Sequence, residues 1–211
     1  MPFDLYVITD EGLSHGLSHV EIARRALVGG ADVIQLRDKA LPCRDLVRIR
    51  KEIHAITQPA GALFIVNDRL DIALACGADG VHLGQGDISP GVARQLSPPG
   101  FIIGVSVGDC REAQSAEWEG ADYVVLSPVF ATSSKDDAGP GYGLDQLRKI
   151  RRSISIPVLA IGGIGPGNAR DVIRAGADGV AVISAVVSAP DIAKAARDLR
   201  ALIRKTKREA P

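Results

Sequence analysis

Two carboxylates, Asp68 and Asp87, lie near the ends of an otherwise apolar and glycine-rich stretch, "NDRLDIALACGADGVHLGQGD" at residues 67–87. Oxygen ligands without a histidine or cysteine partner suit magnesium, which accepts few protein ligands and completes its shell with phosphate oxygens and water. The pair could instead act as a general acid and base, or Asp68 could cap a helix that begins near Arg69. Taken alone, the two residues fit a helix cap at least as well as a metal site.

Basic side chains come together in the segment "QLRDK". In an extended chain, alternation places Gln35, Arg37 and Lys39 on the same side. A guanidinium fork and an ammonium group that point to one place are suited to a phosphate or a diphosphate. The alternative is a surface cluster of ion pairs with Asp38 or Asp45.

A second anion signal is the segment "SPVFATSSKDDAGPGYG", residues 127–143, which contains Thr132, Ser133, Ser134 and Lys135. Hydroxyl groups, free backbone amides and a lysine in a long loop predict an anion-binding cradle and lid. An ordinary flexible loop is the alternative.

The elements that must position these side chains follow from an internal repeat. The phrase Gly-Ala-Asp precedes a short apolar run four times, from Gly30, Gly77, Gly120 and Gly176, and each run predicts a strand. Four more apolar runs predict strands at residues 4–9, 62–67, 101–106 and 155–161. Runs with little alternation are typical of parallel strands that are buried on both faces.

Amphipathic patterns separate the strands and predict helices, among them residues 18–30, 43–56, 167–176 and 190–208. Several end in a glycine suited to the left-handed C-terminal position, just before the repeated phrase. Eight strands that alternate with about eight helices predict an α/β fold, the (β/α)8 TIM barrel, as a single catalytic domain over residues 1–211. An open doubly wound sheet is the competing architecture, and four matching two-unit repeats favour closure of the barrel.

In such a barrel, chemistry belongs at the carboxyl ends of the strands, where the polar residues named above fall. The segments "AIGGIGPGNARDVI" and "AVISAVV" follow the seventh and eighth strands, the usual phosphate site of this fold. Glycines that serve only a tight turn are the alternative there. His82 is interpreted as a core imidazole satisfied by the backbone, and Trp118 and Tyr123 as packing residues.

Composition limits the possible partners. Of the 211 residues, 46% are hydrophobic, and 25 basic residues balance 25 acidic ones, so no excess charge indicates nucleic acid or a membrane surface. Cys43, Cys76 and Cys110 are far apart in the sequence and are expected to be reduced. Without a charged leader or a long apolar segment, the protein is expected to be cytoplasmic. The sequence leaves the oligomeric state open, with a homo-oligomer as one alternative.

The chain also resembles a known family. "YVITD", "QLRDK", "NDRLDIALACGADGVHLGQGD", "GVSVG", "LSPVFATSSK", "AIGGI" and "GADGVAVISA" occur in this order across nearly its whole length and are similar to the motifs of the thiamine-phosphate synthase family. The resemblance implies a transferase of thiamine biosynthesis that joins a pyrimidine methyl diphosphate to a thiazole phosphate, in its carboxylated or hydroxyethyl form. The products are thiamine phosphate and pyrophosphate, and the implied mechanism is dissociative and depends on magnesium.

The resemblance also implies residue roles. Contacts to the pyrimidine diphosphate fall to Gln35, Leu36, Arg37, Asp38, Lys39, Asn67, Ser106 and Lys135, of which Arg37, Lys39, Ser106 and Lys135 are expected to be catalytic. Contacts to the thiazole phosphate fall to Thr132, Ser133, Ser134, Gly163, Ile183 and Ser184. The magnesium ligands are Asp68 and Asp87.

Two departures from the family pattern affect the alternatives. After the fifth strand the superfamily often has Ser-x-His, where this chain has Ser106-Val107-Gly108, and the loop has Ser133 where a second threonine is common. A related thiazole tautomerase uses a histidine at the position of Gly108, so the glycine argues against that activity. A non-catalytic protein that binds thiamine precursors is the third hypothesis.

Overall fold

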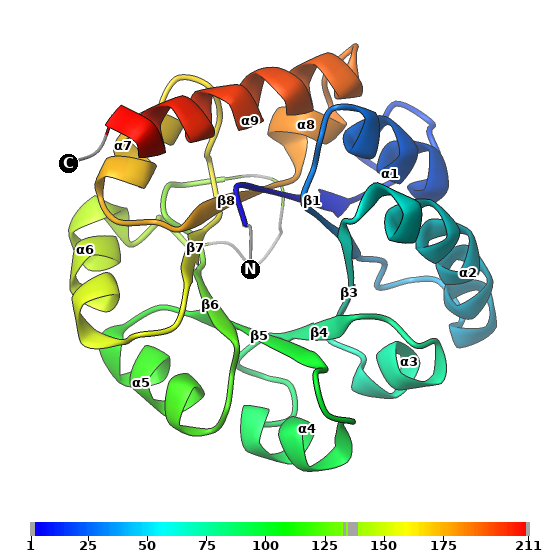
Figure 1. Ribbon diagram of the computed structural model, residues 1–211, viewed down its shortest axis with the longest axis horizontal. Helices are drawn as coiled ribbons and strands as arrows, with labels where there is room; N and C mark the ends of the chain where they lie inside the picture. Colours follow the sequence, from blue (N-terminus) through cyan, green and yellow to red (C-terminus); the bar gives the residue numbers. More distant parts are fainter. Residues whose placement is uncertain (1–2, 133, 135–138, 210–211) are drawn as a thin grey trace.

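Eight parallel strands close into a barrel in the computed structural model, which describes residues 3–132, 134 and 139–209 (Figure 1). Each strand pairs with the next along the chain, and β8 pairs with β1. The strands are β1 (Leu5–Thr9), β2 (Val33–Leu36), β3 (Leu63–Asn67), β4 (Gly80–Leu83), β5 (Ile102–Val107), β6 (Tyr123–Leu126), β7 (Val158–Ala160) and β8 (Gly179–Val182). The predicted α/β barrel is therefore confirmed, and the open sheet is wrong.

Helices surround the barrel and connect its strands. They are α1 (His19–Val28), α2 (Cys43–Ala60), α3 (Leu70–Ala75), α4 (Pro90–Leu96), α5 (Cys110–Trp118), α6 (Gly143–Ser153), α7 (Ala169–Arg174), α8 (Ser184–Val187) and α9 (Ile192–Glu209). The short α8 is the extra turn that the fold often places after its last strand. Within the described part of the chain, no helix is long and apolar enough to cross a membrane.

The repeated Gly-Ala-Asp phrase has a structural purpose at the start of the even strands. Its glycine adopts a positive φ in all four copies, between 59° and 104°, so the left-handed residue is the glycine of the phrase itself. Its aspartate accepts a hydrogen bond from the backbone N–H at the start of the preceding strand. The four bonds are Leu5 N to Asp32, Phe64 N to Asp79, Ile103 N to Asp122 and Val158 N to Asp178, at 2.7 to 2.9 Å. The repeat therefore joins the strands in pairs at the amino-terminal end of the barrel.

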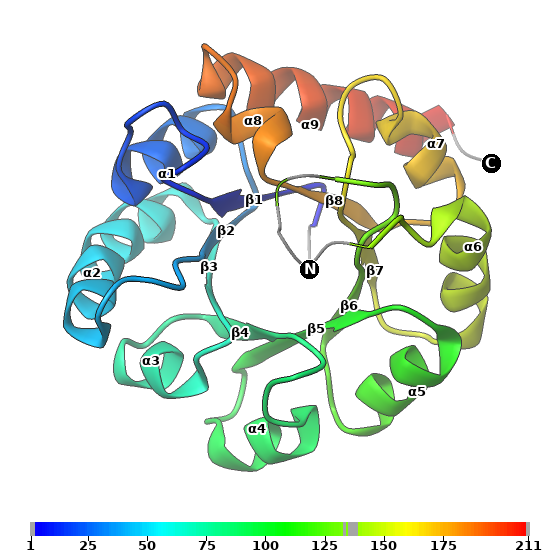
Figure 2. The same cartoon turned by 180° about the vertical axis from the view of Figure 1, so that it is seen from behind.

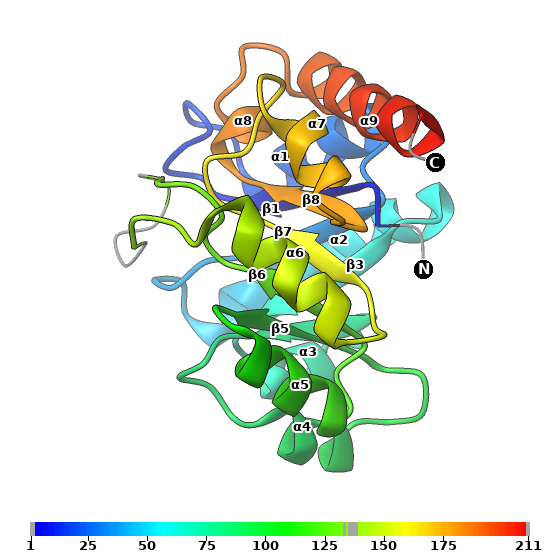
Figure 3. The ribbon, with the colours of Figure 1, turned by 90° about the vertical axis from the view of Figure 1, so that its left-hand side faces the viewer.

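The last helix lies outside the barrel and is joined to that same end. α9 packs against α1 and α7, and two of its basic residues, Arg204 and Lys207, pair with Asp4 at 2.7 Å and 2.6 Å. Figure 3 shows the start of β1 and the end of α9 at this end, whereas the described part of the segment between β6 and α6 projects from the other. Figure 2 views the barrel from that other end, where the strands terminate.

Candidate active site

A cavity of about 930 Å³ opens at the carboxyl ends of the strands. Residues at or near the ends of β2 to β8 line it. A volume of this size is typical of a site for small molecules.

The structure brings most of the predicted site residues to this cavity. Those that line it are Arg37, Lys39, Asn67, Asp68, Asp87, Ser106, Thr132, Ser134, Gly163, Ile183 and Ser184. Gln35, Leu36 and Asp38 are not among the lining residues, because their side chains contact other parts of the protein. Ser133 and Lys135 lie outside the described residues.

Asp68 directly follows β3, Asp87 lies in the turn after β4, and the two carboxylates interact with each other. Asp68 has a positive φ of 61°, an unusual conformation that aspartate tolerates, and its N–H donates to the His82 carbonyl at 2.8 Å. The N-cap residue of α3 is Arg69, and no side chain caps this helix, so Asp68 is not a helix cap. The Asp87 Oδ2 atom accepts from Gly84 N at 2.7 Å, which fixes this carboxylate in the turn after β4.

The charged groups around Asp68 have opposite effects on its pKa. Burial raises the pKa of Asp68 above its ordinary value, and the adjacent Asp87 carboxylate raises it further. The positive charges of Lys39 and Arg37 lower the pKa in part. A cation between the two carboxylates would relieve their repulsion. No group of three or more His, Cys, Asp or Glu side chains with metal-binding geometry occurs among the described residues, so the protein can offer two carboxylates.

Arg37 and Lys39 arrive at the cavity from the loop after β2. The Arg37 side chain is 15% exposed, and its Nη1 lies 3.4 Å from Asp10 Oδ2 in the loop after β1. Asp45 pairs with Arg48 on its own helix, at 3.8 Å, and Asp38 pairs with His19. The predicted alternative of a surface cluster with Asp38 or Asp45 is therefore wrong, and the two cations face the cavity.

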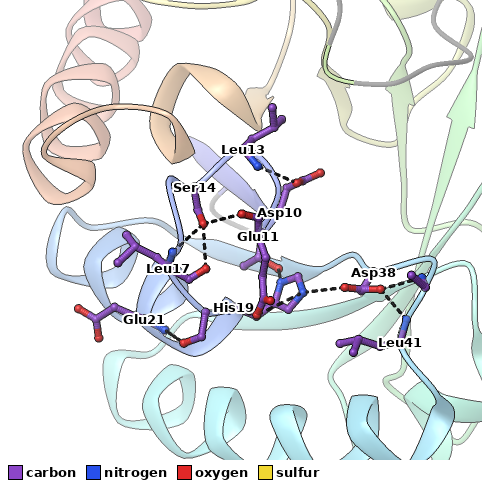
Figure 4. Close-up of polar contacts among 12 residues, drawn as sticks. Asp10, Glu11, Leu13, Ser14, Leu17, His19, Glu21, Asp38 and Leu41 are labelled. Atoms are coloured by element: carbon purple, nitrogen blue, oxygen red, sulfur yellow. Dashed lines mark hydrogen bonds and ion pairs between the residues drawn. The ribbon is translucent and has the colours of Figure 1, made fainter.

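The side chain of Asp38 holds this loop from behind (Figure 4). One of its oxygens accepts from Ala40 N and Leu41 N, both at 2.7 Å, and the other accepts from His19 Nε2 at 3.2 Å. Burial alone would raise the pKa of Asp38, but the two amides and His19 outweigh it, and the pKa is lowered. Asp38 thus helps to position Arg37 and Lys39, the basic residues on either side of it.

His19 contacts residues of both the loop after β1 and the loop after β2. It is 1% exposed, and its Nδ1 lies 2.7 Å from Thr9 Oγ1 at the end of β1. Its backbone N–H donates to Glu11 Oε1 at 2.9 Å (Figure 4). Sequence reasoning missed this histidine, which joins the loops after β1 and β2. No spacing pattern in the sequence links His19 to Asp38, because only the folded barrel brings the start of α1 beside the loop after β2.

A cluster of hydroxyl groups occupies the opposite side of the cavity. Ser134 Oγ donates to Ser184 Oγ at 3.0 Å, and Ser134 N donates to Thr132 Oγ1 at 3.2 Å. This contact joins the segment after β6 to the start of α8. Gly163, with φ 61°, lies so close to Ala131 that a Cβ would approach its carbonyl oxygen to 2.6 Å. Glycine is therefore required where the backbone lines this side.

Polar side chains also fill the barrel beneath the cavity. His82 is 8% exposed, and its ring nitrogens contact the Tyr123 and Ser106 side chains at 3.2 and 3.0 Å, two contacts that the predicted core imidazole satisfied by the backbone did not include. Gln35 donates from Nε2 to the Tyr6 hydroxyl at 2.7 Å. The predicted packing role of Tyr123 is incomplete because its hydroxyl joins this network, and Trp118, at 91% exposure, is not a packing residue.

The glycine after β5 makes room for an aromatic side chain. A Cβ at Gly108 would lie 2.4 Å from the Tyr142 hydroxyl oxygen, and both residues line the cavity. Tyr142 therefore takes the space that a side chain at position 108 would need.

A closed (β/α)8 barrel with cations and paired carboxylates on one side of its mouth, and hydroxyl groups with close-packed backbone on the other, defines a barrel enzyme for phosphorylated small molecules. The family model for thiamine monophosphate synthase matches residues 5–186. The chain belongs to this family of transferases.

Relatives of the same family cover almost the whole chain. The thiamine-phosphate synthase of Methanoregula boonei is 62% identical over 209 residues, which is 99% of this chain and 97% of the relative. That of Methanoculleus marisnigri is 61% identical and covers 99% of each chain. Among solved structures, the thiamine phosphate pyrophosphorylase from Pyrococcus furiosus has a TM-score of 0.90 at 47% identity, over 97% of each chain.

Proposed function

We propose that this chain acts as the thiamine-phosphate synthase of its host and makes thiamine phosphate from a pyrimidine methyl diphosphate and a thiazole phosphate. The ring nitrogen of the thiazole forms the new bond to the pyrimidine methylene carbon. The bond from that carbon to the diphosphate oxygen breaks, and pyrophosphate leaves with the electron pair. Family membership supports the reaction, and the substrates are inferred from it.

The observation that carries the proposal is the presence of two distinct anion-binding sides in one cavity. Arg37 and Lys39 lie with the carboxylates on one side, and Thr132, Ser134 and Ser184 lie on the other. The first side suits a diphosphate that takes up negative charge as it departs, and the second suits a phosphate monoester. A reaction between a diphosphate and a phosphate needs both sides together.

Magnesium is proposed as the cofactor of the diphosphate side. Asp68 and Asp87 are the ligands that we infer, and two carboxylates match an ion that fills its remaining positions with phosphate oxygens and water. The raised pKa of Asp68 beside Asp87 supports this assignment, because a cation between the two carboxylates would reduce their repulsion. When bound, magnesium would neutralise charge on the departing pyrophosphate.

The residues of the chain supply orientation and electrostatic stabilisation in this reaction. Arg37 would bind the diphosphate as a fork, with Asp10 holding its guanidinium at the edge of the cavity. Lys39 and, by resemblance, Lys135 would add positive charge, and Asn67 and Ser106 would contact the first substrate. No strong base is needed, because the leaving group departs with the bonding electrons and the thiazole nitrogen already carries its lone pair.

The test of the proposed function is turnover by the purified chain. With both substrates and magnesium we expect thiamine phosphate, and with magnesium removed by a chelator we expect none. Asp87→Asn should raise the magnesium concentration needed for half-maximal rate at least tenfold. Asp71→Asn is the matched control, because Asp71 is an exposed carboxylate on α3 that pairs with Arg69. An unchanged magnesium dependence in Asp87→Asn would remove Asp87 from its assigned role.

The thiazole tautomerase alternative receives no support from the cavity. Tyr142 takes the space beside Gly108, so no side chain at this position can carry a proton. Isomerisation of a thiazole phosphate without the pyrimidine substrate would argue for that alternative. We also propose, from the sequence, that nucleic acid and membranes are not partners and that the enzyme is cytoplasmic. A homo-oligomer stays an open prediction.

A further inference from the structure

A chain of five polar side chains runs through the barrel interior and ends at the cavity. Gln35 Nε2 lies 2.7 Å from the Tyr6 hydroxyl, which lies 3.1 Å from the Tyr123 hydroxyl. Tyr123 then contacts His82 Nδ1 at 3.2 Å, and His82 Nε2 contacts Ser106 Oγ at 3.0 Å. Of these residues, His82 and Ser106 line the cavity.

The hydrogen-bond capacity of each group favours one direction along the chain, the one in which every hydroxyl proton has an acceptor. The Gln35 amide nitrogen can only donate, so Tyr6 accepts from it and has its own proton left for Tyr123. In this arrangement Tyr123 accepts from Tyr6 and donates its own proton to His82 Nδ1. Burial raises the pKa of both tyrosines above their ordinary value, so both keep their protons.

The same logic fixes the tautomer of the histidine. Because His82 Nδ1 accepts a hydrogen bond, the proton of the neutral imidazole is on Nε2, which donates to Ser106 Oγ. The Ser106 oxygen is then an acceptor toward the interior, and its own proton is free to be donated elsewhere. The side of Ser106 that is not occupied by His82 faces the cavity.

We propose that Tyr6, Tyr123 and His82 are positioning residues that set Ser106 as a hydrogen-bond donor toward an anionic oxygen in the cavity. This inference rests on the proposed function, since it assigns the oxygen to the diphosphate. A phosphate oxygen only accepts hydrogen bonds. A serine with the opposite orientation would present lone pairs to that oxygen and repel it.

The backbone shows that space is reserved for this chain. A Cβ at Gly104 would lie 2.0 Å from the Tyr123 ring and 2.3 Å from its hydroxyl oxygen. Tyr123 is fully buried, and its ring contacts Phe3, Tyr6 and His82. Glycine at position 104 therefore admits the tyrosine that links the interior of the barrel to the cavity.

The direct test is the tautomer of His82, measured by ¹⁵N NMR of the imidazole nitrogens in the full-length protein. The signals are assigned by their loss in His82→Gln. The expected result is a neutral ring with the proton on Nε2. A proton on Nδ1 would mean that His82 donates to Tyr123 and accepts from Ser106, which would overturn the proposal, as would a doubly protonated ring. The wild-type spectrum alone decides this point, whether or not the protein makes thiamine phosphate.

Substitutions then test whether the chain acts through Ser106. Tyr123→Phe removes one hydroxyl oxygen and should change the tautomer populations of His82, whereas Tyr142→Phe, outside the chain, should leave them as they are. Pyrophosphate binding in the presence of magnesium, measured by calorimetry, should weaken about tenfold in Tyr123→Phe and in Ser106→Ala. The double variant should bind no more weakly than Ser106→Ala. Additive losses would show that Tyr123 does not act through Ser106.

Discussion

His19 offers the sharpest mutational test of how the cations are held. Replacing His19 with leucine puts an apolar side chain of similar size in the buried position but removes the contacts to Thr9 and Asp38. The loop that carries Arg37 and Lys39 then loses one of the three hydrogen bonds that Asp38 makes. We expect the loop to leave its binding conformation for much of the time.

The size of the effect follows from the contact that is lost. A hydrogen bond to a charged group contributes about 1.5 to 3 kcal/mol. Because the Asp38 side chain is 19% exposed and water replaces part of the bond, the lower end applies. About 1.5 kcal/mol corresponds to roughly a tenfold change in the population of the loop conformation. The apparent affinity for the diphosphate should fall by the same factor.

The assay is steady-state kinetics with each substrate varied in turn. His19→Leu should raise the KM of the pyrimidine diphosphate about tenfold, by the same estimate, and should change the KM of the thiazole phosphate much less. His19→Gln keeps a donor for Asp38 and should recover part of the loss. His15→Asn is the matched control, since His15 is exposed in the segment between β1 and α1, just before His19, and has a positive φ of 55° that asparagine tolerates. Equal effects on both KM values would refute the reasoning.

Three further predictions concern stability. Folding raises the pKa of Asp68, so ionisation of this carboxylate destabilises the fold as pH rises. Asp68→Asn should therefore melt at a higher temperature than wild type at pH 7 without magnesium. A lower melting temperature would contradict this. Gly104→Ala should lower the free energy of unfolding by about 1–3 kcal/mol in a denaturant titration, because the added methyl group overlaps the buried Tyr123 ring; wild-type stability would contradict this. Burial alone would raise the pKa of Asp4, but the hydrogen bonds from α9 outweigh it, and the pKa is lowered. The Asp4 carboxylate therefore stabilises the fold above its unfolded pKa, and this stabilisation is lost as pH falls through the folded pKa. Asp4→Asn should therefore melt several degrees below wild type at pH 7, about 2 kcal/mol, and the gap should close below about pH 4; a gap that persists in acid would count against the ion pair.

The barrel could be predicted from the sequence because its repeat has a direct physical cause. Each Gly-Ala-Asp phrase combines a left-handed glycine with an aspartate that joins two strands, and both needs are local. Apolar runs without alternation then identify the strands between the repeats. The location of the site followed, since polar residues after parallel strands must meet at one end of the barrel.

The orientation of individual side chains could not be predicted in this way. Alternation placed Gln35 with Arg37 and Lys39, yet Gln35 points into the barrel and bonds to Tyr6, because the strand ends at Leu36 and the loop begins after it. Likewise His19 contacts Asp38 across two loops, and Tyr123 reaches His82 across the barrel. Such contacts depend on the closure of the sheet, which no single segment of the sequence encodes.

The ratio of the two products tests the central claim most directly. Pyrophosphate and thiamine phosphate are measured together after the purified chain is incubated with magnesium and the pyrimidine diphosphate, with and without the thiazole phosphate. We predict equal amounts of both products when both substrates are present, and little of either when the thiazole is omitted. Pyrophosphate released without thiamine phosphate would indicate a diphosphate hydrolase, and the absence of both products would contradict the assignment of this cavity.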